Sequence, residues 1–306
     1  MVYNYFDKMI TSAYAGCVGR TGKEGYTKMG NGSLQELEIT QGTVVSLAVT
    51  AAVLFALPII YVALWKKRCG KNVSFAPLII GAAGFLVTVR VLELGVHMIC
   101  IVLDNPISRF INGSTPAFVL YGILMAGIFE ECGRYVIIKF LMKKNKTKEN
   151  MVMYGIGHGG IEVWAITLLT VINFLVIAVI LRTQGTENGL QLLGITGNAP
   201  ESVINSVTAV TAMVADFGAV TGALYVFERF CCMFLHIGFT ILVAYGIAKG
   251  QKKYLLYAIL AHAITDTLPA LSQRGVVNMW VVELWVLACA AVLTVWGVKL
   301  YQKWAE

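Results

Sequence analysis

The chain has 306 residues, of which 58% are hydrophobic and only 13% are charged, and its mean hydropathy is +0.73. These values exclude an ordinary soluble domain, which carries about 25% charged residues, and indicate a protein that crosses a membrane several times. The formal net charge is +7. Basic loops beside a membrane account for this charge, so it does not indicate nucleic-acid binding.

The first 42 residues lack the basic start, apolar core and cleavage site of a signal peptide. We expect residues 1–42 to form an extracytoplasmic N-terminal segment and residues 43–306 to form one membrane-embedded domain.

Beyond this segment the chain contains apolar stretches long enough to cross a bilayer. A spanning helix needs about 20 mainly apolar residues, and backbone inside the hydrocarbon must satisfy its own hydrogen bonds. Seven stretches qualify: 43–65, 75–102, 116–142, 151–181, 218–248, 254–272 and 277–299. The sequence therefore predicts an all-α, polytopic bundle of about seven transmembrane helices, with one short helix near 201–213 in a loop.

Basic residues gather in the loops on one side of these spans. They follow the first, third, fifth and seventh spans: Lys66, Lys67, Arg68, Lys71, Lys143, Lys144, Lys146, Lys148, Lys249, Lys252, Lys253, Lys299 and Lys303. By the positive-inside rule this side faces the cytoplasm. We expect a multi-pass protein of the cytoplasmic membrane, with its N-terminus outside, its C-terminus inside, and acidic lipid headgroups beside its basic loops.

Ionisable side chains interrupt four of the apolar spans. In chain order they are Glu130, Glu131 and Arg134 in the third span, Tyr154, His158 and Glu162 in the fourth, His236 in the fifth, and His262 and Asp266 in the sixth. At about 1.5 Å per residue, most lie roughly 12–18 Å from the basic ends of their helices and can meet at one level. A charge at the bilayer centre costs about 2.5–3.5 kcal/mol on insertion scales, so this pattern predicts a functional polar chamber.

These residue types suit hydrolysis. A buried carboxylate can take a proton from water, and a nearby imidazole can stabilise the oxyanion that forms. Glu130 and His158 are the natural pair for these roles. Glycines surround His158, and they allow the close approach of either a neighbouring helix or a substrate: Gly155, Gly157, Gly159 and Gly160.

Three short motifs on separate spans match a known family. They are Glu130-Glu131-x-x-Arg134, then Tyr154 followed four residues later by His158, and then His262-x-x-x-Asp266. With these motifs the chain resembles the YhfC family of membrane peptidases. The resemblance extends to a wider group, the type II CAAX prenyl endopeptidases and bacteriocin-processing enzymes (CPBP) and the PrsW proteases. It covers most of the membrane region and implies a CAAX-protease-like helical core.

Two features separate the chain from the prenyl enzymes within that group. The prenyl endopeptidases space their first motif EExxxR, whereas the motif here is one residue shorter and is similar to the EExxK of PrsW. The additional carboxylate of Glu162, one turn after His158, is also similar to the PrsW type. Prenyl-protein processing is therefore not the expected activity.

The resemblance implies a glutamate-dependent intramembrane endopeptidase, without a metal cofactor, that cleaves a membrane-associated protein or peptide. Glu130 would activate water, His158 would assist it or stabilise the oxyanion, and His262 with Asp266 would complete the pocket. Glu131 would be a further catalytic residue beside Glu130. The supporting or pocket residues would be Arg134, Tyr154, Glu162 and His236. We expect the substrate to enter from the cytoplasmic half.

Zinc catalysis is the nearest alternative. His158, His236 and His262 could supply nitrogen ligands, with Glu162 or Asp266 supplying oxygen, although the sequence contains no HExxH motif.

Two further alternatives are not proteolytic. Buried His, Asp and Glu side chains also mark proton pathways, so a proton-coupled transporter is one of them. Arg90, Glu93 and His97 on the second span fit such a pathway, but a structural ion pair with a satisfied histidine is the favoured interpretation. A noncatalytic scaffold that holds a partner in the chamber is the other. We interpret Glu228 and Arg229, adjacent on the fifth span, as an interfacial ion pair.

Overall fold

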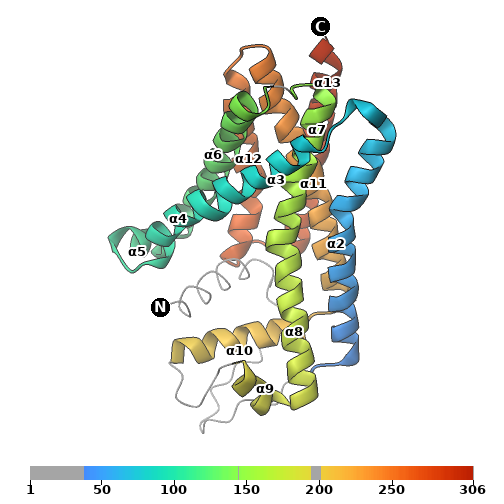
Figure 1. Ribbon diagram of the computed structural model, residues 1–306. Coiled ribbons are helices and arrows are strands. Elements are labelled where there is room, and N and C mark those ends of the chain that lie inside the picture. The colour runs from blue at the N-terminus through green and yellow to red at the C-terminus, as the bar shows by residue number, and fades with distance from the viewer. Residues whose placement is uncertain (1–37, 144, 194–200, 306) are drawn as a thin grey trace.

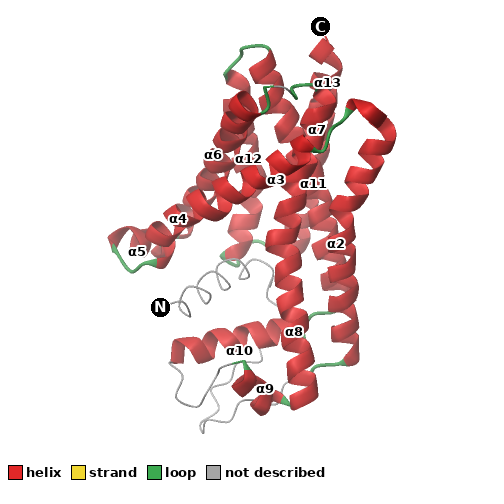
Figure 2. Cartoon of the chain, viewed as in Figure 1, coloured by secondary structure: helices red, strands yellow, loops and turns green. Residues whose placement is uncertain are grey.

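A computed structural model describes residues 38–143, 145–193 and 201–305, and all regular structure within these ranges is helical (Figure 1 and Figure 2). Seven helices are long and apolar enough to cross a membrane: Gln41–Asn72, Ala76–Val102, Thr115–Leu141, Lys148–Gln184, Ala219–Ala248, Lys253–Gln273 and Met279–Gln302. The predicted all-α bundle of seven spans is confirmed. The proposed boundary at residue 42 stays a prediction, because residues 1–37 lie outside the described part of the chain.

The first two spans differ in regularity. The first is one helix, α2 (Gln41–Cys69), extended by a short 3₁₀ turn η1 (Gly70–Asn72). The second combines α3 (Ala76–Val87) and α4 (Leu94–His97) with two π-helical segments, η2 (Thr88–Glu93) and η3 (Met98–Val102). After it comes α5 (Pro106–Gly113), which is capped by Asn105, whose side chain accepts hydrogen bonds from two backbone N–H groups. In Figure 1, α4 and α5 lean away from the rest of the bundle.

The third span is α6 (Thr115–Leu141). The fourth is a continuous rod of α7 (Lys148–Glu162), the π-helical segment η4 (Val163–Leu168) and α8 (Leu169–Gln184). Two helices follow outside the spans, α9 (Thr186–Leu192) and α10 (Glu201–Ala215). The latter confirms the short helix expected near 201–213.

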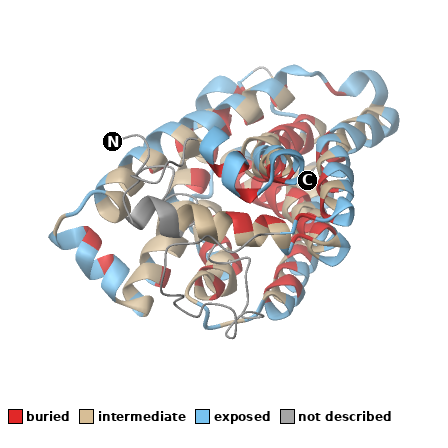
Figure 3. Cartoon of the chain, turned by 90° about the horizontal axis from the view of Figure 1, so that it is seen from below, coloured by how far each residue is buried: buried red, intermediate tan, exposed pale blue. Residues whose placement is uncertain are grey.

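The last three spans are α11 (Ala219–Ala248), α12 (Lys253–Gln273) and α13 (Met279–Gln302), and a 3₁₀ turn η5 (Lys303–Ala305) ends the described chain. The most apolar stretch of α11 is 67% buried, against 17–33% in the other spans. The helix α11 is therefore the centre of the bundle. Figure 3 shows buried residues along the inner helix faces and exposed residues around the outside, and many of the exposed residues are large and apolar, as lipid contact requires.

Glycines allow α7 to pack tightly between its neighbours. A Cβ placed on Gly157 would lie 2.0 Å from the backbone oxygen of Leu78 in α3, and one on Gly155 would lie 2.8 Å from Cα of Ile237 in α11. The same holds for Gly160, whose Cβ would lie 2.9 Å from the Pro58 ring in α2. These glycines therefore serve helix packing, as small residues do between membrane helices, and they hold His158 at a fixed place in the bundle.

Because the Gly157 contact joins two backbones, we expect Gly157→Ala to destabilise the bundle. Overpacking of this kind costs about 1–3 kcal/mol, measurable as the unfolding free energy in mixed micelles. Gly95→Ala is the matched control, since a Cβ on Gly95 meets no atom within 4 Å. Equal stabilities for the two variants would contradict the packing role assigned to Gly157.

Candidate active site

A cavity of about 790 Å³ lies inside the bundle, and the predicted polar residues form its deep end. Its wall on α6 runs from Glu130 back to Phe118, and its wall on α11 runs from Phe239 back to Tyr225. Both directions lead away from the basic ends of these helices. The cavity therefore extends toward the side opposite the basic loops, and it gives no support to the expected entry from the half that carries the basic loops.

The packing of α3 on α7 explains this direction. The two helices touch through Gly157 and through Gly81, where a Cβ would lie 2.2 Å from the Tyr154 backbone oxygen. Beyond these contacts the second span continues into α4 and leans away (Figure 1). The cavity occupies the space that results, because residues of η2, α4, η4 and α8 line it.

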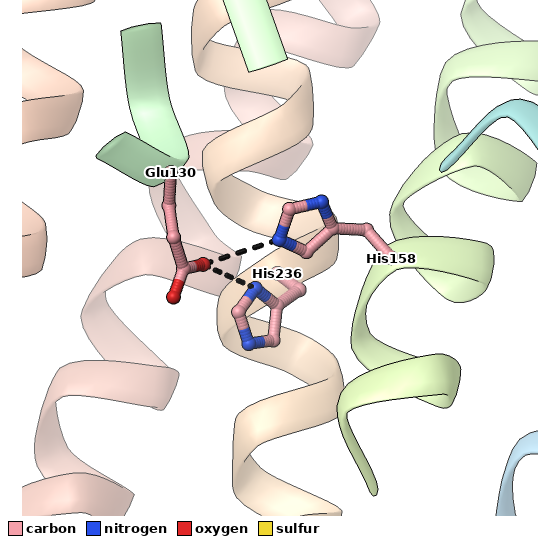
Figure 4. A group of neighbouring side chains, drawn as sticks. All are labelled: Glu130, His158 and His236. Carbon is pink, nitrogen blue, oxygen red and sulfur yellow. Dashed lines mark hydrogen bonds and ion pairs between the residues drawn. The ribbon is translucent and has the colours of Figure 1, made fainter. Parts of the chain in front are cut away.

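The carboxylate of Glu130 is the centre of the polar cluster. Its Oε2 lies 3.1 Å from Nε2 of His158 and 3.8 Å from Nδ1 of His236, as Figure 4 shows. Its Oε1 lies 4.0 Å from Nε2 of His262. The three imidazoles come from α7, α11 and α12, so four helices meet at one carboxylate whose side chain is only 9% exposed.

Arg134 lies one turn from Glu130 and is completely buried. Its Nη2 is 3.0 Å from Nε2 of His158 and 3.2 Å from Nδ1 of His236. The same nitrogen is 3.7 Å from Glu130 Oε2 and 3.5 Å from Glu131 Oε1. Because a guanidinium only donates hydrogen bonds, both imidazole nitrogens must accept them. Arg134 thus balances two buried carboxylates and orients two histidines.

His262 lies between three carboxylates. Its Nδ1 is 2.9 Å from Glu131 Oε1, while its Nε2 is 3.4 Å from Asp266 Oδ2 and faces Glu130. The ring of Phe239 stacks on it at 4.8 Å with an interplanar angle of 7°. Glu131 is completely buried, whereas the Asp266 side chain is 33% exposed to the cavity.

The sequence prediction missed Arg229. Its Nη1 donates to Glu162 Oε1 over 2.8 Å, and Glu162 Oε2 is in direct contact with Nε2 of His236. The expected pair with Glu228 also forms, but Arg229 lines the cavity and belongs to the site. The predicted ion pair of Glu228 and Arg229 is therefore present, and Arg229 extends it to Glu162. Arg229 and His236 are seven positions apart, which is the spacing of two turns on one helix face, and this spacing was the available signal.

The predicted residues divide into two layers. Those that line the cavity are Glu130, Glu162, His236, His262 and Asp266. Those behind them, toward the basic side, are Glu131, Arg134, Tyr154 and His158, and Tyr154 is fully buried with its ring 6.3 Å from that of His158. The structure brings all nine residues together, but Tyr154 and His158 do not line the cavity.

Glu93 and His97 form the structural pair favoured by the sequence. Nε2 of His97 lies 3.2 Å from Glu93 Oε1, and its Nδ1 lies 2.8 Å from the Tyr121 hydroxyl.

The cluster also offers ligands for a metal. The ligand atoms of Glu130, His158 and His236 lie within 4.8 Å of one another, and so do those of Glu130, Glu131 and His262. Nitrogen and carboxylate donors suit zinc. Glu162 contacts the second ring nitrogen of His236, Nε2. A carboxylate in this position commonly supports a zinc-binding histidine. The residues therefore fit zinc chemically, although Nη2 of Arg134 contacts the same His158 and His236 nitrogens that zinc would use.

Seven spans around buried Glu, His and Arg side chains at the end of an internal cavity define a helical membrane protein with a candidate hydrolytic site. The family model described as "YhfC intramembrane metalloprotease" matches residues 53–286. The "Uncharacterized membrane protein YhfC" of Bacillus subtilis (strain 168) is 33% identical over 262 residues, which are 85% of this chain and 97% of that protein. The chain therefore belongs to the YhfC family of intramembrane proteases. No solved structure matches it.

The family description supports an intramembrane protease in a membrane. It names a metalloprotease, which favours the zinc alternative over the expected absence of a metal cofactor. The relationship to the wider CAAX endopeptidase and PrsW group stays a prediction, as do the cytoplasmic membrane and the orientation of the termini.

We expect Arg134→Gln to destabilise the folded protein strongly. It leaves two buried carboxylates without their cation, and such a break costs about 3–5 kcal/mol. The measurement is the unfolding free energy in mixed micelles. Arg109→Gln is the control, because Arg109 pairs with Asp104 on the exposed surface and such pairs contribute little. If both variants had the unfolding free energy of the wild type, the role assigned to Arg134 would be refuted.

Proposed function

We propose that this protein is an intramembrane endopeptidase in which Glu130 is the general base. The observation that carries the proposal is the position of Glu130, whose carboxylate faces the cavity while the guanidinium of Arg134 lies behind it. A water molecule in the cavity can reach this carboxylate, and a substrate segment can lie across it.

His158 and His262 then have different roles. His158 Nε2 accepts from Arg134 Nη2 at 3.0 Å, so it has no hydrogen to donate to the ionised base, and its role is to hold Arg134 beside Glu130. His262 faces the cavity, and its Nε2 can donate a hydrogen bond to a developing oxyanion when the ring is protonated. The surrounding carboxylates of Glu131 and Asp266 stabilise that protonated form. We therefore assign oxyanion stabilisation to His262, not to His158.

The reaction follows from these positions. Glu130 takes a proton from water as the water oxygen attacks the carbonyl carbon of the scissile peptide bond. The carbonyl oxygen becomes an oxyanion beside His262. When the C–N bond breaks, Glu130 returns the proton to the leaving nitrogen, so the products are a carboxylic acid and an amine.

The cavity also bears on the substrate. Its wall is largely apolar apart from the polar deep end, and membrane helices surround it. Such a space suits a membrane-embedded protein or peptide whose unwound segment reaches Glu130. We propose that this substrate enters from the side opposite the basic loops.

Zinc catalysis is the second candidate, and the mutual distances of Glu130, His158 and His236 favour it. Zinc held by these residues would act as a Lewis acid on the scissile carbonyl. In that case Arg134 must leave the two imidazole nitrogens that it now contacts, because one lone pair cannot serve both.

Glu130→Gln keeps the size of the side chain but removes the base. We expect cleavage of a labelled membrane-peptide library in bilayers to fall by at least about 100-fold, the low end of the contribution of general-base catalysis. Glu187→Gln is the matched control, since Glu187 is exposed and lies outside the cavity. Cleavage by Glu130→Gln at the wild-type rate would refute the proposal.

A chelator separates the two mechanisms. For the metal-free mechanism we expect full cleavage after treatment with phenanthroline and no zinc above background by elemental analysis, since no step then depends on a bound metal. One zinc per chain, lost together with activity on chelation and absent from His236→Ala, would establish the zinc mechanism instead.

A further inference from the structure

We propose that Arg229 is a positioning residue, which acts through Glu162 to fix the ring nitrogen of His236 that carries the proton. The consequence for catalysis rests on the proposed peptidase function, whereas the effect on His236 does not. Arg229 lies outside the three motifs of the family resemblance.

Two adjacent helices build this arrangement. Arg229 and His236 are separated by two turns on one face of α11, and Glu162 is the last residue of α7. One carboxylate oxygen of Glu162 accepts from Arg229 Nη1 at 2.8 Å, and the other contacts His236 Nε2. The three side chains are only 14%, 13% and 7% exposed in the order Arg229, Glu162, His236. Glu162 is thus held at both oxygens.

Only one neutral form of His236 fits its two neighbours. An ionised carboxylate accepts hydrogen bonds and does not donate them, so Nε2 of His236 carries the hydrogen that faces Glu162. The other nitrogen, Nδ1, then has a lone pair, which accepts from Arg134 Nη2 at 3.2 Å. The opposite tautomer would direct an N–H group at the guanidinium and a lone pair at the carboxylate, and both contacts would be repulsive.

Arg229 is what keeps Glu162 in this position. Glu162 lines the cavity and could rotate into it if its bond to α11 were lost. The other end of the guanidinium is fixed by Glu228, so Arg229 presents Nη1 toward Glu162. Without this hold, His236 would lose its Nε2 partner, and Arg134 would lose one of the two imidazole acceptors of its Nη2. The same lone pair on Nδ1 is required for zinc, so the arrangement serves either mechanism.

The tautomer can be measured directly. The chain contains four histidines, so protein labelled with ¹⁵N at histidine gives a simple spectrum in micelles, and His236→Asn assigns the signals of His236. We expect His236 in the wild type to be the Nε2–H tautomer. In Arg229→Gln we expect a mixture of tautomers, and in Arg229→Lys a return toward the wild-type spectrum, because an ammonium can also pair with Glu162.

Cleavage kinetics supply the second readout. We expect kcat of Arg229→Gln to fall by about 10- to 100-fold, the usual effect of losing a carboxylate-type support behind a site histidine, with KM changed by less than about threefold. Arg229→Lys should recover most of kcat. The double variant with Glu162→Gln should be no slower than the slower single variant, because both substitutions break the same contact. Arg109→Gln is the control for loss of an arginine.

The outcomes separate the proposals. A wild-type His236 spectrum in folded Arg229→Gln overturns the positioning role, whatever happens to cleavage. An altered spectrum together with unchanged kcat overturns its catalytic consequence. If the wild type cleaves no peptide at all, the proposed function fails, and the spectrum still decides whether Arg229 positions His236. Should Arg229→Gln not fold, Glu162→Gln and Arg229→Lys provide the same comparison.

Discussion

The buried guanidinium of Arg134 is the interaction on which the site depends. It lies within 4.0 Å of two carboxylates and two imidazoles, with no exposed surface of its own. Charges in a low-dielectric interior are tolerated only when they are paired and hydrogen-bonded. Since its partners come from α6, α7 and α11, the same contacts that neutralise the charge also tie three membrane helices together. A substitution of Arg134 is therefore expected to change both the stability of the helix bundle and the geometry of the site.

The glycines of α7 make this arrangement possible. Gly155 and Gly157 let the backbone of α7 approach those of α11 and α3 closely. This close approach allows His158 and His236 to contact the same guanidinium. In a bilayer, where apolar burial adds little to helix association, such close packing and polar contacts supply the cohesion. The four glycines around His158, which left two interpretations open in the sequence, belong to this packing.

The spans and the depth of the polar residues were predictable because both follow from the number of residues along the chain. The length of each apolar stretch identifies a membrane-spanning helix, and a rise of about 1.5 Å per residue places Glu130, His158 and His262 at similar depths. What could not be counted depends on helix rotation and tilt. The contact of Arg229 with Glu162 requires a particular face of α11 to meet α7, and the direction of the cavity requires the second span to diverge from the fourth. Neither the contact nor the direction of the cavity can be inferred from the hydropathy pattern of the sequence.

The π-helical segments lie where this divergence begins. η2 begins at Thr88, which packs on Gly133 between Glu130 and Arg134, and η4 follows directly on Glu162, so each begins at the polar cluster. Both contribute residues to the cavity wall, among them Arg90, Glu93 and Ile166. Insertions of this kind in membrane helices are frequent at functional sites because they change which side chains face inward. A straight continuation of α3 and α7 would carry the tight packing at Gly157 outward and leave less room for a substrate beside Glu130. The irregular segments and the polar cluster thus complement each other: closely packed helices on the basic side hold the buried Glu, His and Arg side chains, and the diverging segments on the other side line the cavity.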